Sequence, residues 1–213
     1  MIKFENAIFP SSEQYKTIFN SMRNPLNSWD KSDSKCDNRY NHFTLGENDK
    51  TLALKLVKAG TDHRKFLRMI TVYADITAPL YWWKEFDTYK VGTVANSCST
   101  MHKLTSKRLT LDDFSIDNNE QGYYVDILYD LNALIDNYKI TKQIKYFRML
   151  VGMLPSSYNQ KRTAMFNYEV LANIYKSRQG HKLKEWHDFC EWIEELPYSE
   201  LIKEGIHKCK CQA

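Results

Sequence analysis

The longest helical pattern in this sequence runs from Tyr124 to Tyr138. Apolar and aromatic side chains recur there at intervals of three and four residues, namely Tyr124, Ile127, Leu128, Leu131, Leu134, Ile135 and Tyr138. Because residues three and four apart share one face of a helix, this spacing predicts a long helix with one buried stripe. Other elements are needed to cover that stripe.

The remaining patterns supply those elements. Met69 to Ile76 alternates β-branched residues with others and predicts a strand, and Lys3 to Phe9 predicts a first strand. Further helices are expected after Ser11, after Asn48 and after Pro79, and over residues 142–153, 160–178 and 183–196. The expected class is α+β: a small, mostly antiparallel sheet packed with several long helices. A length of 213 residues suits a single domain, 1–213.

Local signals set several expected boundaries. Ser11 and Gln14 form a capping-box pattern, and Asn24-Pro25 is expected to end the helix that follows. Asn48 is expected to cap the second helix and Gly60 to stop it. In the last helix, Trp186, Cys190 and Ile193 are expected to face inward. The polar residues 24–48 predict a loop insertion, and residues 198–213 a C-terminal tail.

Charge and composition exclude some classes of function. The net charge is only +4, and the densest basic stretches, 103–108 and 203–210, lack the interleaved aromatic residues of a nucleic-acid groove. We therefore expect no nucleic-acid partner. A small anionic ligand fits this charge. The aromatic share of 14% suits a core, a ligand platform or a subunit interface.

Cysteine usage and hydropathy bear on location. The five Cys residues are irregularly spaced, there is no signal-peptide pattern, and no apolar run approaches the ~20 residues of a membrane helix. We expect a cytoplasmic protein with reduced thiols and no membrane partner. The tail residues His207, Cys209 and Cys211 do not have zinc-site spacing, so no metal is expected.

Three blocks of residues resemble one protein family. The first is Ala59 to Arg68, the second is Glu85 to Met101, and the third contains Leu154-Pro155 followed by Asn167, Asn173 and Arg178. In this order they resemble the flavin-dependent thymidylate synthases, also called thymidylate synthase complementing proteins, over residues 48–195. No P-loop, GxGxxG, nucleophile-elbow or HExxH motif competes with this resemblance.

The first two blocks match in outline. In the first, Gly60 and Phe66 match a Gly-His-x-Ser-x-Phe-Glu-His segment, and Arg68 takes the place of its flavin-contacting His. In the second, one residue is inserted before Asn96 relative to the family signature Gln-x-x-Arg-His-Arg-x-x-Ser-x-Asn-Glu-x-Ser-x-Arg. The residues at its named positions are Glu85, Thr88, Tyr89, Lys90, Thr93, Asn96, Ser97, Ser99 and Met101.

The third block keeps the family spacing Asn-x5-Asn-x4-Arg. In the family the Asn pair helps to hold FAD and the Arg grips the nucleotide, which assigns these roles to Asn167, Asn173 and Arg178. The family also has an Arg four residues before the Pro, where this chain has Val151. Arg148 and Arg162 are the candidates to replace it.

The resemblance implies a fold, cofactors and a site. The fold would be that of a thymidylate synthase complementing protein, assembled as a homotetramer. FAD would take hydride from NADPH, and methylenetetrahydrofolate would supply a one-carbon unit to C5 of a pyrimidine deoxynucleotide, dUMP or a related one. FAD would contact Arg68, Thr88, Tyr89, Lys90, Asn96, Asn167 and Asn173. The nucleotide would contact Glu85, Ser97, Ser99 and Arg178. No residue is assigned to catalysis.

The departures from the family signature leave two alternatives for the function, an enzyme with an altered ligand site and a non-catalytic protein. Loss of Arg side chains removes charge-assisted hydrogen bonds of about 1.5–3 kcal/mol each, so the chain binds another ligand or holds the same one with different groups. The alternative is a non-catalytic nucleotide- or flavin-binding scaffold on the same fold.

Taken alone, several residues have ordinary structural explanations. Arg178 suits a helix C-terminus, Asn96 a turn, and Trp82-Trp83 a core. Cys98 has no evident base beside it, so we interpret it as a structural thiol. His63 and His102 match no ligand spacing.

Overall fold

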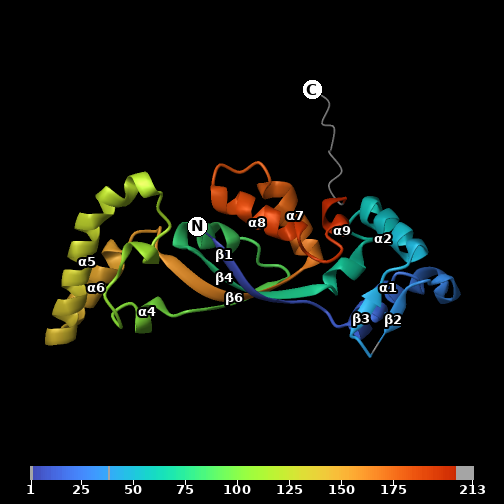
Figure 1. Ribbon diagram of the computed structural model, residues 1–213, viewed down its shortest axis with the longest axis horizontal. Coiled ribbons are helices and arrows are strands. Elements are labelled where there is room, and N and C mark those ends of the chain that lie inside the picture. Colours follow the sequence, from blue (N-terminus) through green and yellow to red (C-terminus); the bar gives the residue numbers. More distant parts are fainter. Residues whose placement is uncertain (1, 38, 205–213) are drawn as a thin grey trace, which may run out of the picture. The chain divides into compact units, whose positions relative to one another are not determined.

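A computed structural model describes residues 2–37 and 39–204, and Figure 1 shows its helices and strands. The strands are β1 (Lys3–Ile8), β2 (Lys35–Asp37), β3 (His42–Thr44), β4 (Thr71–Pro79), β5 (Thr93–Ser97) and β6 (Asn159–Asn167). The α-helices are α1 (Ser12–Ser21), α2 (Glu47–Ala59), α3 (Leu80–Phe86), α4 (Thr100–Lys103), α5 (Gln121–Thr141), α6 (Ile144–Met153), α7 (Tyr168–Arg178), α8 (Lys184–Glu194) and α9 (Glu200–Lys203). Short 3₁₀ turns are η1 (Asn24–Leu26), η2 (Trp29–Lys31), η3 (Lys65–Arg68), η4 (Leu111–Asp113) and η5 (Asn118–Glu120).

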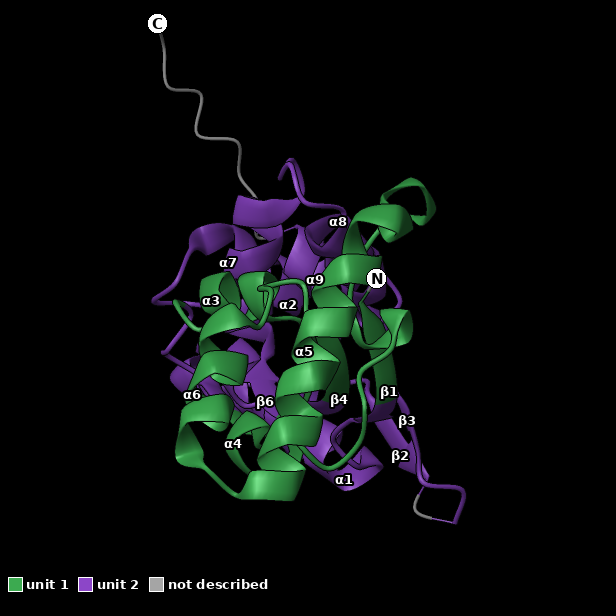
Figure 2. Cartoon of the chain, turned by 90° about the vertical axis from the view of Figure 1, so that its left-hand side faces the viewer, with its two compact units in different colours: residues 1–5, 75–88, 95–163 green, residues 6–74, 89–94, 164–213 purple. Residues whose placement is uncertain are grey.

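A four-stranded antiparallel sheet is the central element. Its order is β1-β4-β6-β5, which places β5 at an edge, and β2 and β3 form a separate hairpin. The α+β class predicted from the sequence is confirmed. The chain divides into two compact units, coloured in Figure 2, and each strand of the larger sheet contributes residues to both.

The first unit comprises residues 1–5, 75–88 and 95–163 and contains α3 to α6. The predicted stripe of α5 is buried or half-buried here except at Ile127, which is exposed: Leu131 and Ile135 pack with Leu150 of α6 and with Phe114. Trp82 and Trp83 of α3 are fully buried, as their expected core role requires.

The second unit comprises residues 6–74, 89–94 and 164–213. One part of its core is a cluster of aromatic rings from Tyr15, Phe19, Phe43 and Tyr198. A second part joins β6 to α8, where Phe166, Phe189 and Trp192 pack edge to face or tilted. Trp186 and Ile193 are fully buried and Cys190 nearly so, which confirms the predicted inward face of α8.

Helix ends follow the local signals in part. Ser11 and Gln14 form the predicted capping box of α1, and Gly60 ends α2 with a positive φ of 104°. Helix α1 ends at Ser21, before Asn24-Pro25, because that dipeptide opens a 3₁₀ turn instead. Asn48 is not the cap of α2, since the N-cap is Gly46.

The cap of α2 comes from a distant carboxylate. Asp33 accepts hydrogen bonds from the backbone N–H groups of Asn48 (2.9 Å) and Asp49 (3.1 Å). Asp49 is itself fully buried and pairs with Arg23 at 2.6 Å. Segment 24–48, predicted as a loop insertion, therefore contains two 3₁₀ turns and the hairpin β2–β3 and is tied to α2 by polar contacts.

The predicted helix over residues 160–178 is wrong in its first half. Residues 159–167 form β6, and only 168–178 form a helix. Gln160, Ala164 and Phe166 are buried while Lys161 and Thr163 are exposed, so this segment alternates as a strand does. Pairing in the sheet overrides the helix propensity of its Lys, Arg, Ala and Met residues.

The C-terminal segment is described only as far as Glu204. Within it, Leu201 and Ile202 of α9 are fully buried, so residues 198–204 are packed rather than a loose tail. The tail residues His207, Cys209 and Cys211, for which no metal was expected, lie outside the described residues. Among described helices, none is long and apolar enough to cross a membrane.

Candidate functional site

Arg178 lies at the end of α7 among aromatic side chains of the second unit. Its Nε donates a hydrogen bond to the Tyr89 hydroxyl at 2.9 Å. Its guanidinium carbon lies 4.6 Å from the ring centre of Trp186 and 5.6 Å from that of Tyr89. The structure thus brings together two predicted site residues, one assigned to the nucleotide and one to FAD. Trp186, which the sequence placed only in the core, is part of the same group.

Asn167 and Gly92 form a second close contact in this unit. Asn167 caps α7 by accepting a hydrogen bond from the Val170 N–H at 3.0 Å. Gly92 has a φ of +84°, and a Cβ built on it would lie 2.7 Å from the Asn167 amide nitrogen. The Thr93 hydroxyl also donates to the Tyr89 carbonyl. The turn that carries Tyr89 is therefore held against the start of α7.

The Asn pair does not share one helical face. Asn167 ends β6 and caps α7, whereas Asn173 lies within α7 and is exposed. The expectation of two Asn residues nearly two turns apart on one helix is wrong, because the helix begins only at Tyr168. Lys90 and Arg68 are exposed, the latter in η3.

The other predicted residues belong to the first unit. Thr88 donates its hydroxyl hydrogen to the Glu85 carbonyl at 2.7 Å, at the end of α3. Glu85 is half-buried. Asn96 and Ser97 are exposed on β5, at the sheet edge. Segment 91–100 thus contains an edge strand.

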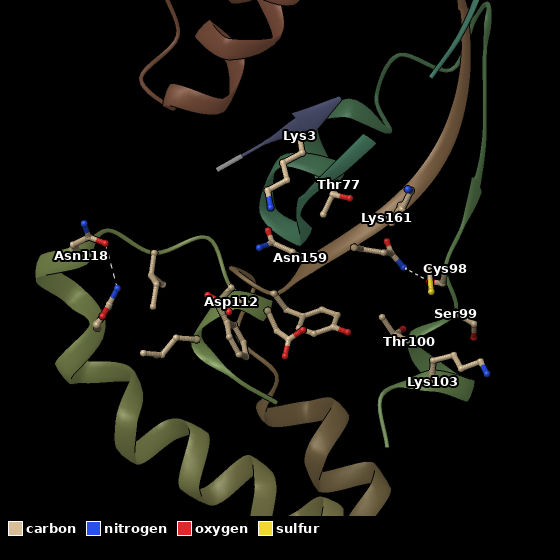
Figure 3. Close-up of a pocket in the computed structure, with 17 residues that line it drawn as sticks. Lys3, Thr77, Cys98, Ser99, Thr100, Lys103, Asp112, Asn118, Asn159 and Lys161 are labelled. Atoms are coloured by element: carbon tan, nitrogen blue, oxygen red, sulfur yellow. Dashed lines mark hydrogen bonds between the residues drawn. The ribbon is translucent and has the colours of Figure 1, made fainter. Parts of the chain in front are cut away.

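A pocket of about 730 Å³ lies within the first unit, and Figure 3 shows its lining. Ser99 lines it together with Thr100, Lys103 and Cys98, and Thr77 and Lys3 come from other strands. Ser99 also caps α4 by accepting a hydrogen bond from the His102 N–H at 3.2 Å. The remaining lining residues are Leu111, Asp112, Asp113, Phe114, Ile116, Asn118, Gln121, Tyr158, Asn159, Gln160 and Lys161.

Gln160 fixes one wall of this pocket. Its amide nitrogen donates to the Cys98 carbonyl at 2.8 Å, and its side-chain oxygen accepts from the Nε of Arg162 at 2.9 Å. Arg162 also contacts Asp87 at 2.8 Å and stacks over Trp83 at 4.3 Å. Arg162 is therefore engaged by Gln160, Asp87 and Trp83 of its own unit. No local sequence pattern marked Gln160.

The charges at the pocket are mixed: in the part of the chain that the structure describes, Lys3, Lys103 and Asp112 line it without an ion pair. Lys161 pairs with Glu5 at 2.9 Å and with Asp75 at 3.4 Å. Asp113 pairs with Lys107 at 2.6 Å. Burial, with Asp113 and Cys98 nearby, raises the pKa of Tyr158, so its hydroxyl stays a neutral hydrogen-bonding group.

This arrangement suits binding of an anion more than acid–base catalysis. Hydroxyl groups of Ser99 and Thr100 beside lysine ammonium groups are suited to phosphate. Cys98 is exposed. In the part of the chain that the structure describes, no group of three His, Cys, Asp or Glu side chains is placed to hold a metal ion.

Comparison with solved structures identifies the fold. Thymidylate synthase X (ThyX) of Helicobacter pylori, solved with FAD and dUMP, superposes with a TM-score of 0.71 and 16% identity over 96% of this chain and 97% of that one. A second structure, of flavin-dependent thymidylate synthase ThyX from Helicobacter pylori complexed with FAD and dUMP, gives 0.69 and 15% over 97% and 99%. The fold is that of ThyX.

At the level of sequence, no family model and no curated protein gives a significant match. The ThyX fold is thus kept here with few identical residues. The three sequence blocks show the same trend, because their spacing matches the family motifs more often than their residues do.

Proposed function

We propose that this chain is an FAD-dependent enzyme of the thymidylate synthase type. It transfers a one-carbon unit to C5 of a pyrimidine deoxynucleotide, dUMP or a related nucleotide. The observation that carries the proposal is the ThyX fold, which extends over 96% of the chain. The ordered signature blocks add support, because they place Ser99 and Arg178 among groups suited to anion binding.

The nucleotide is proposed to bind in the pocket of the first unit. A volume of about 730 Å³ is within the usual range for small-ligand sites. Ser99 would donate to the phosphate, and Lys103 would supply charge that Met101 no longer provides. Glu85 and Ser97 of the same unit do not line this pocket, and Arg178 belongs to the second unit, so these three are proposed as nucleotide-binding residues on the resemblance alone.

The groups of the second unit fit the chemistry of FAD. A flavin needs flat apolar surfaces and its diphosphate needs cations, and Tyr89, Trp186, Arg178 and Lys90 offer both. The proposed FAD-binding set is that of the resemblance: Arg68, Thr88, Tyr89, Lys90, Asn96, Asn167 and Asn173. When bound, FAD supplies the hydride chemistry, with NADPH and methylenetetrahydrofolate as co-substrates.

The chain's own contribution is placement. The Asn167–Gly92 contact and the Arg178–Tyr89 hydrogen bond hold the turn at residues 89–93 in one conformation before any ligand binds. Such preorganisation lowers the cost of ordering a site on binding. Following the family, we also propose a homotetramer.

Turnover assays test this function. Purified protein would be supplied with FAD, NADPH and methylenetetrahydrofolate and with either dUMP or dCMP, and the methylated product measured by mass spectrometry. Product from dUMP supports the ordinary family reaction, and product from dCMP supports a changed base. Product from neither contradicts the proposal.

Two matched variants test the proposed nucleotide site. Lys103→Gln is expected to raise KM for the nucleotide, because it removes a pocket cation. Lys84→Gln removes an exposed lysine of the same unit that does not line the pocket, so KM should stay unchanged. Equal effects of the two substitutions would argue against a role for Lys103 in binding.

A non-catalytic scaffold is the second candidate. One observation favours it: Arg178 is already engaged by Tyr89 and Trp186, where the family uses Arg for the nucleotide. The scaffold is expected to bind flavin or nucleotide without oxidising NADPH. Oxidation of NADPH by the flavin-loaded protein would exclude it.

A further inference from the structure

Gln160 of β6 connects segments of the first unit that are far apart in the sequence. Its side chain contacts the segment that follows β5, and its backbone carbonyl contacts α3. Gln160 is only 9% exposed, so its polar groups are largely withdrawn from water. The segment after β5, residues 98–100, bears directly on ligand binding, because Ser99 and Thr100 line the pocket.

Arg162 determines which way the amide of Gln160 points. An Arg side chain only donates hydrogen bonds, so the Gln160 atom 2.9 Å from its Nε must be the amide oxygen. The amide nitrogen is then the atom 2.8 Å from the Cys98 carbonyl, to which it donates; this bond is the dashed line that ends at Cys98 in Figure 3. The reverse orientation would set donor against donor and acceptor against acceptor, at the cost of both hydrogen bonds.

Helix α3 holds Arg162 in turn. The guanidinium pairs with Asp87 at 2.8 Å, and its carbon lies 4.3 Å from the ring centre of Trp83. The indole N–H of Trp83 also donates to the Gln160 carbonyl at 2.9 Å. Because Trp83 is fully buried, this chain of contacts begins in the packed core of the unit.

The chain of contacts ends at the peptide bond that precedes Ser99. A peptide unit is planar, so fixing the Cys98 carbonyl also fixes the direction of the Ser99 N–H. The Cys98 N–H donates to the Lys161 carbonyl at 2.9 Å, so β6 holds both backbone polar groups of Cys98. Strand β5 ends at Ser97, and the amide of Gln160 therefore orders the chain beyond the end of the strand.

We infer that Gln160 is a positioning residue that holds Ser99 and Thr100 in the arrangement that receives the nucleotide phosphate. The inference rests on the proposed function, which supplies the nucleotide. It assigns to Gln160 an effect exerted through the backbone of Cys98 rather than through the ligand. A segment that is already ordered loses less conformational freedom on binding, so the nucleotide binds more tightly.

Gln160→Glu is the variant that tests this role. The Glu side chain has the same size and still accepts from Arg162, and beside that guanidinium it stays ionised at neutral pH, so it cannot donate to the Cys98 carbonyl. Gln143→Glu is the matched control, because it makes the same chemical change at an exposed residue that does not line the pocket.

Hydrogen–deuterium exchange of peptides covering residues 98–103 measures how firmly the segment is held. The backbone N–H groups of Cys98, His102 and Lys103 are hydrogen-bonded there, so their exchange reports its opening. Exchange is expected to rise about threefold to tenfold in Gln160→Glu and to stay at the wild-type rate in Gln143→Glu. Wild-type exchange in folded Gln160→Glu would overturn the inference.

Asp87→Ala tests the same chain of contacts from its other end. The Asp87 side chain is 52% exposed, so its loss should not unfold the protein. Arg162 then loses its ion pair, and exchange over residues 98–103 should rise about twofold. If Gln160→Glu does not fold, this variant decides: a rise supports the inference and an unchanged rate overturns it.

Kinetics separate positioning of the nucleotide from a general structural role. In Gln160→Glu, KM for the nucleotide is expected to rise about threefold to tenfold with kcat unchanged, because the phosphate is held alike in the ground state and the transition state. A fall in kcat with KM unchanged would overturn the inference. Failure of the proposed function is distinguishable: dUMP and dCMP would then leave exchange of residues 98–103 unchanged in the wild type. The exchange of Gln160→Glu would still show whether Gln160 holds the segment.

Discussion

At the scale of single residues, the sequence can indicate a candidate site residue, but only the structure shows which side chains contact it. The spacing of the third block pointed to Arg178, but only the structure shows its guanidinium beside Trp186 and hydrogen-bonded to Tyr89. Tyr89 lies far from it in sequence and Trp186 only one loop further on, and no local pattern encodes either contact. The same holds for Gln160, whose partner Cys98 comes from another part of the sheet.

Gly92 is the residue whose replacement should be most costly to the turn at residues 89–93. Gly92→Ala adds a Cβ 2.7 Å from the Asn167 amide nitrogen and must keep a φ of +84°. We expect a loss of about 1–3 kcal/mol in the free energy of unfolding, measured by urea denaturation. Gly152→Ala is the matched control, because a Cβ there meets nothing within 4 Å. That change should stabilise helix α6 by about 0.5–1 kcal/mol. Equal effects of the two substitutions would contradict the close contact.

The thiols should differ sharply in reactivity. Burial, together with Glu194 and Glu191, raises the pKa of Cys190 to about 11, so its reactive thiolate is scarce at neutral pH. Cys98 is exposed and lines the pocket. Alkylation at neutral pH, followed by peptide mass mapping, should therefore label Cys98 and spare Cys190. Added dUMP should slow labelling of Cys98. Rapid labelling of Cys190 in the folded protein would contradict its burial.

At the scale of elements, a buried ion pair joins Arg23, just before segment 24–48, to α2. Arg23 and Asp49 are 5% and 0% exposed and lie 2.6 Å apart. Asp49→Asn leaves Arg23 buried without its charged partner, so we expect a loss of about 3–5 kcal/mol in the free energy of unfolding. Asp30→Asn changes an exposed carboxylate and should cost little. Urea denaturation at neutral pH compares the two.

The same pair predicts a dependence of stability on pH. Burial raises the pKa of Asp49, but hydrogen bonds from Ser34, Ser32 and Arg23 together outweigh it, so the folded-state pKa is lowered. A lowered folded pKa gives stability that is present above the unfolded value of about 3.9 and lost as pH falls through the folded pKa. Stability of the wild type should therefore fall more steeply below pH ~4 than that of Asp49→Asn. Parallel curves would show that Asp49 is not responsible.

Elements differ in how far the sequence determines them. The capping box at Ser11, the stop at Gly60 and the buried stripe of α5 depend on neighbours within a few residues, and each was predicted. Strand β6 and the cap of α2 were missed, because they depend on pairing in the sheet and on Asp33. The same is true of the candidate site. The sequence predicted which types of residue are present there, but it did not predict which side chains contact one another.

At the scale of the whole molecule, the fold matches that of ThyX although few residues are identical. A TM-score of 0.71 at 16% identity shows that largely different residues form the same architecture. Phosphate recognition tolerates less change, because it depends on particular cations and their geometry. Under the proposed function, Tyr89 and Met101, which differ from the family signature, therefore bear on ligand and reaction rather than on fold.

The central claim is that this chain is a working flavoenzyme, and an absorbance spectrum tests it most directly. Purified protein would be measured with and without added FAD, and then with NADPH under anaerobic conditions. The account predicts flavin bands that remain with the protein after gel filtration and bleach when NADPH is added. Absence of bound flavin at every FAD concentration tried would contradict it and would favour the scaffold.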